Sequence, residues 1–254
     1  MSAPLLKARG ISVAYGTRRR PITALHPTDL DLHAGESVAV VGRSGAGKST
    51  LAEIVLGLRT ASTGHVSVAG ERFCGAGRAP HRRCRHLVQG VPQDAGASLP
   101  PGVPVRVSIE RAIDRLGVGR HDARAAAGAA LDAATAADRI LAAAKIAHLD
   151  PALLDRTPRQ LSGGQAQRAA IARAVAVGPR LIVADEPTSA LDARTAAGLA
   201  DALLALPGRT GGALLLVTHD DALAARCDRI LTVRDGVVTP APGASRPGTA
   251  ERAA

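Results

Sequence analysis

A glycine-rich stretch in the first fifth of the chain combines residue types that bind phosphate. It lies between a short apolar run and a segment with helical periodicity, which is the setting that a phosphate-binding loop requires. Its glycines let backbone N–H groups turn toward phosphate oxygens, Lys48 can bridge the terminal phosphates, and the Ser49 hydroxyl can ligate Mg²⁺. A glycine-rich surface loop is the alternative interpretation, but the flanking segments favour phosphate binding. The stretch consists of Gly42, Arg43, Ser44, Gly45, Ala46, Gly47, Lys48, Ser49 and Thr50.

Two adjacent carboxylates, Asp185 and Glu186, follow the apolar run 181–184. A carboxylate at the end of a buried strand is well placed to hold the Mg²⁺ of a bound nucleotide, directly or through water, which is the role predicted for Asp185. A neighbouring glutamate can orient and deprotonate an attacking water, which predicts Glu186 as the general base. Taken alone, such a pair is commonly a helix cap or a solvated turn. The phosphate loop upstream favours the catalytic interpretation.

A second candidate anion site occurs where another helix begins. Ser162 is a suitable N-cap, and the two glycines beside it leave backbone N–H groups exposed at the helix N-terminus. A chain that binds one nucleotide has no obvious need for two phosphate cradles. The segment consists of Leu161, Ser162, Gly163, Gly164 and Gln165.

This pentapeptide, placed between the phosphate loop and the acidic pair, resembles the signature of ABC ATPases. The resemblance extends from about Leu5 to Val238, and the motifs follow the order of that family. In the family, the signature of one subunit closes over the γ-phosphate bound to the phosphate loop of another. The resemblance therefore implies a head-to-tail pair of ATPase subunits with ATP between them.

Further residues match family positions. Tyr15 falls where the family places an aromatic ring that stacks on adenine, and Gln93 matches a glutamine that senses Mg²⁺ and water. Asp192 belongs to a stretch that resembles the loop crossing the dimer interface, and His219 looks like the histidine that contacts the γ-phosphate. The resemblance thus implies catalytic roles for Glu186, His219 and Gln93, metal contacts for Ser49, Gln93 and Asp185, and contacts to the partner's ATP from Leu161, Ser162, Gly163, Gly164, Gln165 and Asp192.

Two stretches are similar to the ATPases of peptide and nickel importers, namely 82–94 with its continuation to Pro101, and 153–158. The match has three departures: Pro92 replaces a usual aromatic residue, Ala95 a usual proline and Pro100 a usual asparagine. In the family these positions lie near the surface that receives the coupling helix of the membrane subunit. They bear on docking and not on ATP hydrolysis.

The elements that position these motifs follow from the hydrophobic pattern. Strands are predicted at 5–15, 30–33, 37–41 and 64–69, with a helix at 48–58, and the Ala-rich middle reads as helical. From residue 161 onward, helix and strand alternate at 161–177, 180–184, 193–206 and 213–218, which predicts a parallel sheet with right-handed crossovers.

The resemblance places these elements in a fold. It implies an α/β P-loop NTPase with a RecA-like parallel-sheet core, an N-terminal antiparallel β-subdomain and an α-helical signature subdomain. We expect a single ABC ATPase domain over 1–238, with the helical subdomain at about 94–177 inserted in the core. The Pro/Gly/Ala/Ser-rich stretch 239–254 is predicted to be a disordered tail.

Composition narrows the class of protein. The chain has 254 residues, 46% of them hydrophobic and only 1% aromatic, so its core must be aliphatic. No apolar stretch approaches the ~18 to 20 residues of a spanning helix, and residues 1–10 lack the apolar stretch of a signal peptide. The formal charge of +10 comes almost wholly from arginine. Because the arginine clusters lack interleaved aromatic residues, nucleic-acid binding is not expected.

The leading hypothesis is an ATP-binding and ATP-hydrolysing subunit of an ABC transporter that imports peptides or nickel, with ATP and Mg²⁺ as cofactors. Expected partners are a second ABC ATPase subunit, identical or paralogous, two transmembrane permease subunits and, indirectly, an extracytoplasmic substrate-binding protein. The subunit would sit peripherally on the cytoplasmic face of the cell membrane. One alternative is a soluble ABC ATPase acting on ribosomes or DNA, which the charge supports. Another is a P-loop kinase for small molecules, which leaves 161–165 and His219 without a role.

Overall fold

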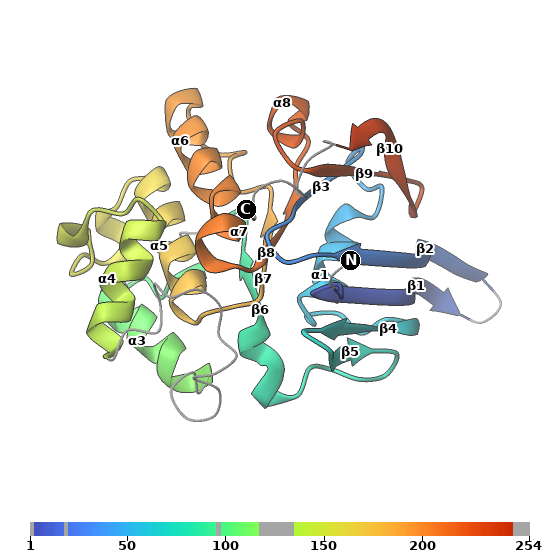
Figure 1. Ribbon diagram of the computed structural model, residues 1–254, viewed down its shortest axis with the longest axis horizontal. Coiled ribbons are helices and arrows are strands. Elements are labelled where there is room, and N and C mark those ends of the chain that lie inside the picture. Colours follow the sequence, from blue (N-terminus) through green and yellow to red (C-terminus); the bar gives the residue numbers. More distant parts are fainter. Residues whose placement is uncertain (1–2, 18–19, 95–97, 117–134, 246–254) are drawn as a thin grey trace.

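Two β-sheets and the helices around them make up the molecule (Figure 1). The computed structural model describes residues 3–17, 20–94, 98–116 and 135–245. Ala95, part of the Ala-rich middle and the last nine residues of the predicted tail lie outside the described residues.

The smaller sheet is antiparallel, with strand order β2-β1-β4-β5. Ala69 and Gly70 join β4 to β5 with positive φ angles of 51° and 82°, as a two-residue hairpin turn requires. The β-rich start is therefore confirmed, but the second strand is much longer than predicted, because it pairs with β1 from Leu32 back to Arg20. The strands are β1 (Leu6–Thr17), β2 (Arg20–Leu32), β4 (Thr63–Val68) and β5 (Glu71–Gly75).

The larger sheet has the order β10-β9-β3-β8-β7-β6 and is parallel except for the antiparallel pair of β9 and β10. Its central strands are short and almost wholly apolar, because helices and the smaller sheet cover both of its faces. This is the predicted RecA-like core. The strands are β3 (Ser37–Val41), β6 (Val88–Val91), β7 (Leu181–Asp185), β8 (Ala213–Val217), β9 (Arg229–Arg234) and β10 (Val237–Ser245).

The last strand corrects one prediction. Residues 239–245, predicted to begin a disordered tail, continue β10 and pair with β9, with Pro240 opposite Leu231. Proline is tolerated there because β10 is an edge strand, so its missing N–H removes no bond to a further strand. Local composition indicated disorder, and pairing with β9 supplies the backbone partners that composition could not reveal.

Helices occupy the predicted middle of the chain, between β6 and β7, and the crossovers of the larger sheet. The helices between β6 and β7 pack against one another, and both α3 and α4 contact α5 (Figure 1). No helix of the described chain is long and apolar enough to cross a membrane. The α-helices are α1 (Lys48–Val55), α3 (Val105–Leu116), α4 (Ala136–Ile146), α5 (Gly163–Ala176), α6 (Ala193–Leu204), α7 (Leu206–Thr210) and α8 (Asp221–Ala224); the 3₁₀ turns are η1 (Arg82–Leu87), η2 (Pro151–Leu153) and η3 (Pro158–Gln160).

The larger sheet separates two hydrophobic cores. Along β3 the side chains alternate, so that Val38 and Val40 join one core while Ala39 joins the other. The first core lies between the two sheets and takes in Leu51 and Ile54 of α1. The second contains the apolar faces of α3, α4, α5 and α6. Helix α1 is thereby clamped between the sheets, which fixes the position of its N-terminus.

Candidate functional site

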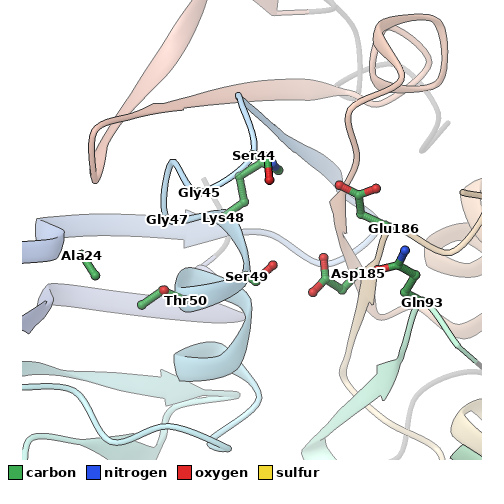
Figure 2. Close-up of a pocket in the computed structure, with 10 residues that line it drawn as sticks. All are labelled: Ala24, Ser44, Gly45, Gly47, Lys48, Ser49, Thr50, Gln93, Asp185 and Glu186. Atoms are coloured by element: carbon green, nitrogen blue, oxygen red, sulfur yellow. The ribbon is translucent and has the colours of Figure 1, made fainter. Parts of the chain in front are cut away.

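A cavity of about 410 Å³ opens between the N-terminal end of α1 and the carboxyl ends of β6 and β7 (Figure 2). It brings together three of the motifs singled out from sequence, which are separated by 40 residues or more along the chain. Its lining residues are Ala24, Ser44, Gly45, Gly47, Lys48, Ser49, Thr50, Gln93, Asp185 and Glu186.

The phosphate loop leaves β3 after Val41 and enters α1 at Lys48, as predicted. Neighbouring strands press against it so closely that two positions have room only for glycine. A Cβ atom on Gly42 would lie 2.3 Å from the Val233 carbonyl oxygen, and one on Gly47 would lie 2.6 Å from the Ala24 carbonyl oxygen. The loop is therefore shaped by contacts to β9 and β2 as well as by its own sequence.

Lys48 holds its charge inside this loop. The residue is only 7% exposed, and its Nζ donates hydrogen bonds to the carbonyl oxygens of Gly42 and Arg43, at 2.9 and 3.1 Å. An ammonium group has three N–H donors, so one remains for an anion in the cavity. Six loop residues line the cavity, whereas Gly42, Arg43 and Ala46 are not among its lining residues.

The side chains of Asp185 and Ser49 lie next to each other at the cavity, as Figure 2 shows. Burial raises the pKa of the Asp185 carboxyl, and its hydrogen bond with Ser49 opposes that rise. One carboxylate oxygen, Oδ1, is buried without a hydrogen-bond partner. Such an atom is costly to bury unless it has a ligand, so the pair fits a hard divalent cation that binds oxygen.

No group of three or more His, Cys, Asp or Glu side chains within the described ranges could hold a metal ion alone. A cation bound by Ser49 and Asp185 would thus need further oxygens from a ligand. Mg²⁺ is commonly bound in that way, by one or two carboxylates together with substrate phosphates.

Glu186 stands at the end of β7 with a positive φ of 46°, an uncommon value for a residue other than glycine. Its backbone N–H donates to the Val217 carbonyl at 2.9 Å, and the backbone N–H and hydroxyl of Ser189 both donate to its carbonyl. Its carboxylate Oε2 lies 2.6 Å from Nδ1 of His219, whose side chain is 66% exposed. The carboxylate is therefore fixed at the cavity wall and linked to the end of β8.

Gln93 follows β6 and lines the same cavity. The preceding residue is tied to the helical region, because buried Gln167 of α5 donates through Nε2 to the Pro92 carbonyl at 2.9 Å. Pro92 is partly buried and Pro100 is exposed, so two of the three departures from the importer pattern lie at or near the surface. The wall that carries Gln93 is connected to α5 through Gln167.

The signature segment lies outside the cavity. Ser162 caps α5, accepting from the Gln165 N–H at 3.3 Å, while the Gln165 side chain accepts from the Ser162 N–H at 2.9 Å. Asp192 caps α6 by accepting from the Thr195 N–H at 3.0 Å, and this hydrogen bond lowers the pKa of its carboxyl. Ser162, Gly163 and Asp192 are exposed. Leu161, Gly164, Tyr15 and His219 are also absent from the lining, so the structure of one chain joins only part of the predicted site.

One lining residue was missed by sequence reasoning. Ala24 reaches the cavity because β2 pairs with β1 along its whole length and crosses beside the loop. An alanine within a strand carries no chemical signal, so only the tertiary structure could identify it.

The sequence matches the family model described as ABC transporter over residues 25–189. This chain belongs to the ABC transporter family. It is an ATP-binding subunit of that family and an ABC-type ATPase that hydrolyses ATP.

Curated relatives and solved structures agree with this assignment. The chain is 38% identical to the nickel import ATP-binding protein NikE of Rhodospirillum rubrum, over 96% of this chain and 87% of that protein. It is 35% identical to the lipoprotein-releasing system ATP-binding protein LolD of Pseudomonas fluorescens, over 91% and 96%. Among solved structures, the dimeric post-hydrolysis state of the ATP-binding cassette MJ0796, bound to ADP and Pi, matches with a TM-score of 0.72 and 29% identity, over 92% and 98%.

These findings confirm the P-loop NTPase fold and the resemblance to nickel-importer ATPases. They give no support to a soluble ABC ATPase acting on ribosomes or DNA. One of these relatives is named for nickel import and the other for lipoprotein release, so the similarity extends to transport systems with different cargoes.

Proposed function

We propose that this ABC ATPase powers an importer of nickel or peptides, in which two ATPase subunits clamp ATP and drive two permease subunits. The observation that carries the proposal is the convergence of Lys48, Asp185 and Glu186 on one cavity. Those residues supply a phosphate-binding cation, a metal-binding carboxylate and a candidate base.

ATP would lie with its phosphates over the N-terminus of α1. The loop Gly42–Thr50 would contribute backbone N–H groups and the third N–H of Lys48, and the helix dipole favours the negative charge there. Tyr15 would stack on the adenine. Ser49 and Asp185 would hold Mg²⁺, with Gln93 beside it, and the partnerless Oδ1 of Asp185 supports that assignment. A cation bound there would offset the negative charge of the nucleotide phosphates.

Glu186 would act as the general base. It takes a proton from water while the water oxygen bonds to the γ-phosphorus and the bond to the leaving ADP breaks. The 2.6 Å contact from His219 Nδ1 supports a role for His219 in orienting this carboxylate. His219 would also contact the γ-phosphate. Gln93 would help to position the water.

The partner subunit would complete each site. Leu161–Gln165 lie outside the cavity of their own chain, and the start of α5, where Ser162 and Gly163 are exposed, would form a second place for phosphate. We propose that these residues and Asp192 contact the ATP held by the other subunit. The dimeric state of the solved relative supports this arrangement.

The remaining partners and the location follow from the same proposal. The ATPase pair would lie on the cytoplasmic face of the membrane, beneath two permease subunits, with an extracytoplasmic binding protein delivering the cargo. The identity shared with NikE over nearly the whole chain supports nickel as one of the two proposed cargoes.

The decisive test of the ATPase mechanism is Glu186→Gln. We expect ATP hydrolysis to fall by ~100-fold or more, because a general base contributes about 10²- to 10⁴-fold. ATP binding should remain, and an ATP-bound dimer should accumulate on size-exclusion chromatography. Lys48→Ala is the control, since it should lose binding and dimer together. Hydrolysis at the wild-type rate in Glu186→Gln would exclude Glu186 as the base.

Cargo can be tested in cells that lack the gene. We expect accumulation of radiolabelled nickel to fall and to be restored by the wild-type gene but not by Glu186→Gln. Normal nickel accumulation with impaired dipeptide uptake would identify the peptide alternative, and normal uptake of both would contradict the importer.

A further inference from the structure

The ring of Tyr15 has a cation over it. The guanidinium carbon of Arg59 lies 5.3 Å from the ring centroid, which is within the range of a cation–π contact. Tyr15 is near the end of β1, opposite Ile22, which is itself 70% exposed. So exposed a cross-strand neighbour offers the ring little packing, which makes the contact with Arg59 a source of restraint.

Arg59 is itself held in place by α1. Its Nε donates to Oε2 of Glu53 at 2.5 Å, and this hydrogen bond raises the pKa of the Arg59 guanidinium. The backbone N–H groups of Leu58 and Arg59 both donate to the Glu53 carbonyl, at 2.9 and 3.2 Å. Glu53 lies one helical turn after Ser49 and Thr50, which line the cavity. A continuous set of contacts thus runs from the phosphate helix to the aromatic ring.

We propose that Arg59 is a positioning residue for the nucleotide base, in that Glu53 and Arg59 hold the Tyr15 ring ready to stack on adenine. This inference rests on the proposed stacking role of Tyr15. A planar guanidinium covers one face of a ring, and Tyr15 is still 42% exposed with Arg59 present, which leaves surface for a second planar partner. Fixing the ring beforehand reduces the conformational entropy lost when the base binds.

The arrangement predicts that the effect of Arg59 on binding affinity depends on the nucleotide base and not on the phosphates. Removing Arg59 should weaken the binding of every adenine nucleotide by a similar factor, because the same ring would then have to be ordered by each of them. Inorganic tripolyphosphate, which has no base, should bind as before. The maximal rate of hydrolysis should change little, because the ring does not touch the reacting atoms.

The experiment uses Arg59→Met, which keeps an apolar stem and removes the cation, and Arg59→Lys, which keeps the cation. The chain has one tyrosine and no tryptophan, so intrinsic fluorescence excited in the tyrosine band reports on Tyr15 alone. We expect Arg59→Met to increase iodide quenching of this emission and to raise Kd for ATP and ADP, and KM, by about three- to tenfold. The value of kcat should stay within about twofold, and Arg59→Lys should restore part of the affinity.

Arg226→Ala is the matched control, because it removes an exposed arginine and its ion pair with Asp201 without touching an aromatic ring. It should leave quenching and nucleotide affinity unchanged. If Arg59→Met weakened the binding of tripolyphosphate as much as that of ATP, the loss of affinity would come from general electrostatic attraction. That result would overturn the inference.

Tyr15→Ala separates this inference from the proposed function. Weaker ATP binding in Tyr15→Ala together with wild-type binding in Arg59→Met would overturn the role of Arg59 and leave the stacking role intact. Wild-type ATP binding in Tyr15→Ala would overturn the stacking role, and the role of Arg59 with it. Weakened binding in both variants, with unchanged tripolyphosphate affinity, is the result that we expect.

Discussion

Two neighbouring carboxylates at the end of β7 have different surroundings. Asp185 is half-buried and has a buried oxygen without a hydrogen-bond partner, whereas Glu186 is held by the backbone and by the imidazole of His219. A protein can give two carboxylates different chemical roles by placing them in different environments. The carboxylate with the partnerless oxygen suits a cation, and the carboxylate held by His219 suits water.

This contrast predicts that Asp185→Asn stabilises the nucleotide-free protein while abolishing Mg²⁺-dependent hydrolysis. Burial raises the pKa of Asp185, so the charged form is disfavoured in the folded state. The neutral amide removes that cost, and we expect Tm near pH 7 to rise by about 1–4 °C in differential scanning calorimetry.

The sign with respect to pH follows from the direction of this shift. Between the pKa of Asp185 in the unfolded chain and its higher folded value, the folded state binds more protons, so the contribution of this group to stability falls as pH rises. The advantage of Asp185→Asn should therefore disappear below about pH 4, where the aspartate is protonated in both states. Asp155→Asn is the control, because Arg106 lowers the pKa of that carboxyl and no gain is expected. A Tm of Asp185→Asn below that of the wild type at pH 7 would contradict the argument.

Helices α5 and α6 meet where each begins. A Cβ atom on Gly164 of α5 would lie 2.2 Å from Cγ2 of Thr195 on α6. Each helix is also capped by its own side chain, Ser162 for α5 and Asp192 for α6. The close contact at Gly164 therefore sets the spacing of two helix N-termini that are both predicted to reach the partner's ATP.

Gly164→Ala should reduce the free energy of unfolding by about 1–3 kcal/mol, because the added methyl group overpacks this contact. Thr195→Ser removes the clashing methyl and keeps the hydroxyl, so the double variant should recover most of the loss in urea unfolding. Thr195→Ser alone is the control and should change stability by about 0.5 kcal/mol or less. Strictly additive losses in the double variant would show that the steric contact is not the cause.

At the scale of the whole molecule, the chain contains two separate places suited to phosphate. One is the cavity with Lys48, and the other is the exposed start of α5. A head-to-tail dimer would use both, since each subunit would bind one ATP and cover another. The proposal of a symmetric pair thus explains why a single chain carries both.

Complementation between two inactive variants tests the pair. Lys48→Ala removes the phosphate-binding cation, and Gly163→Asp places a negative charge at the start of α5, which the helix dipole tolerates but a second phosphate would not. Each variant alone should be inactive, whereas co-expressed chains with distinguishable tags should recover about a quarter of the wild-type ATPase rate. Mixed dimers that stay inactive would contradict sites shared between subunits.

The sequence by itself determined the motifs that are built from consecutive residues. The phosphate loop, the acidic pair after β7 and the cap of α5 could be recognised because each is built from consecutive residues, whose backbone and side chains act together over a few ångströms. Strand and helix periodicity likewise predicted the alternating core, since it reflects burial of each element's own face.

Contacts between distant segments were decided only by the tertiary structure. The fit of Ala24 and Val233 against the loop, the pairing of Glu186 with His219, the stacking of Arg59 on Tyr15 and the extension of β10 all depend on how strands and helices align across the sheets. None of these has a local signal, because an alanine, a single arginine or a proline-rich stretch can occur in many settings. The sequence thus supplied the chemical groups, and packing around α1 and the larger sheet decided which of them meet.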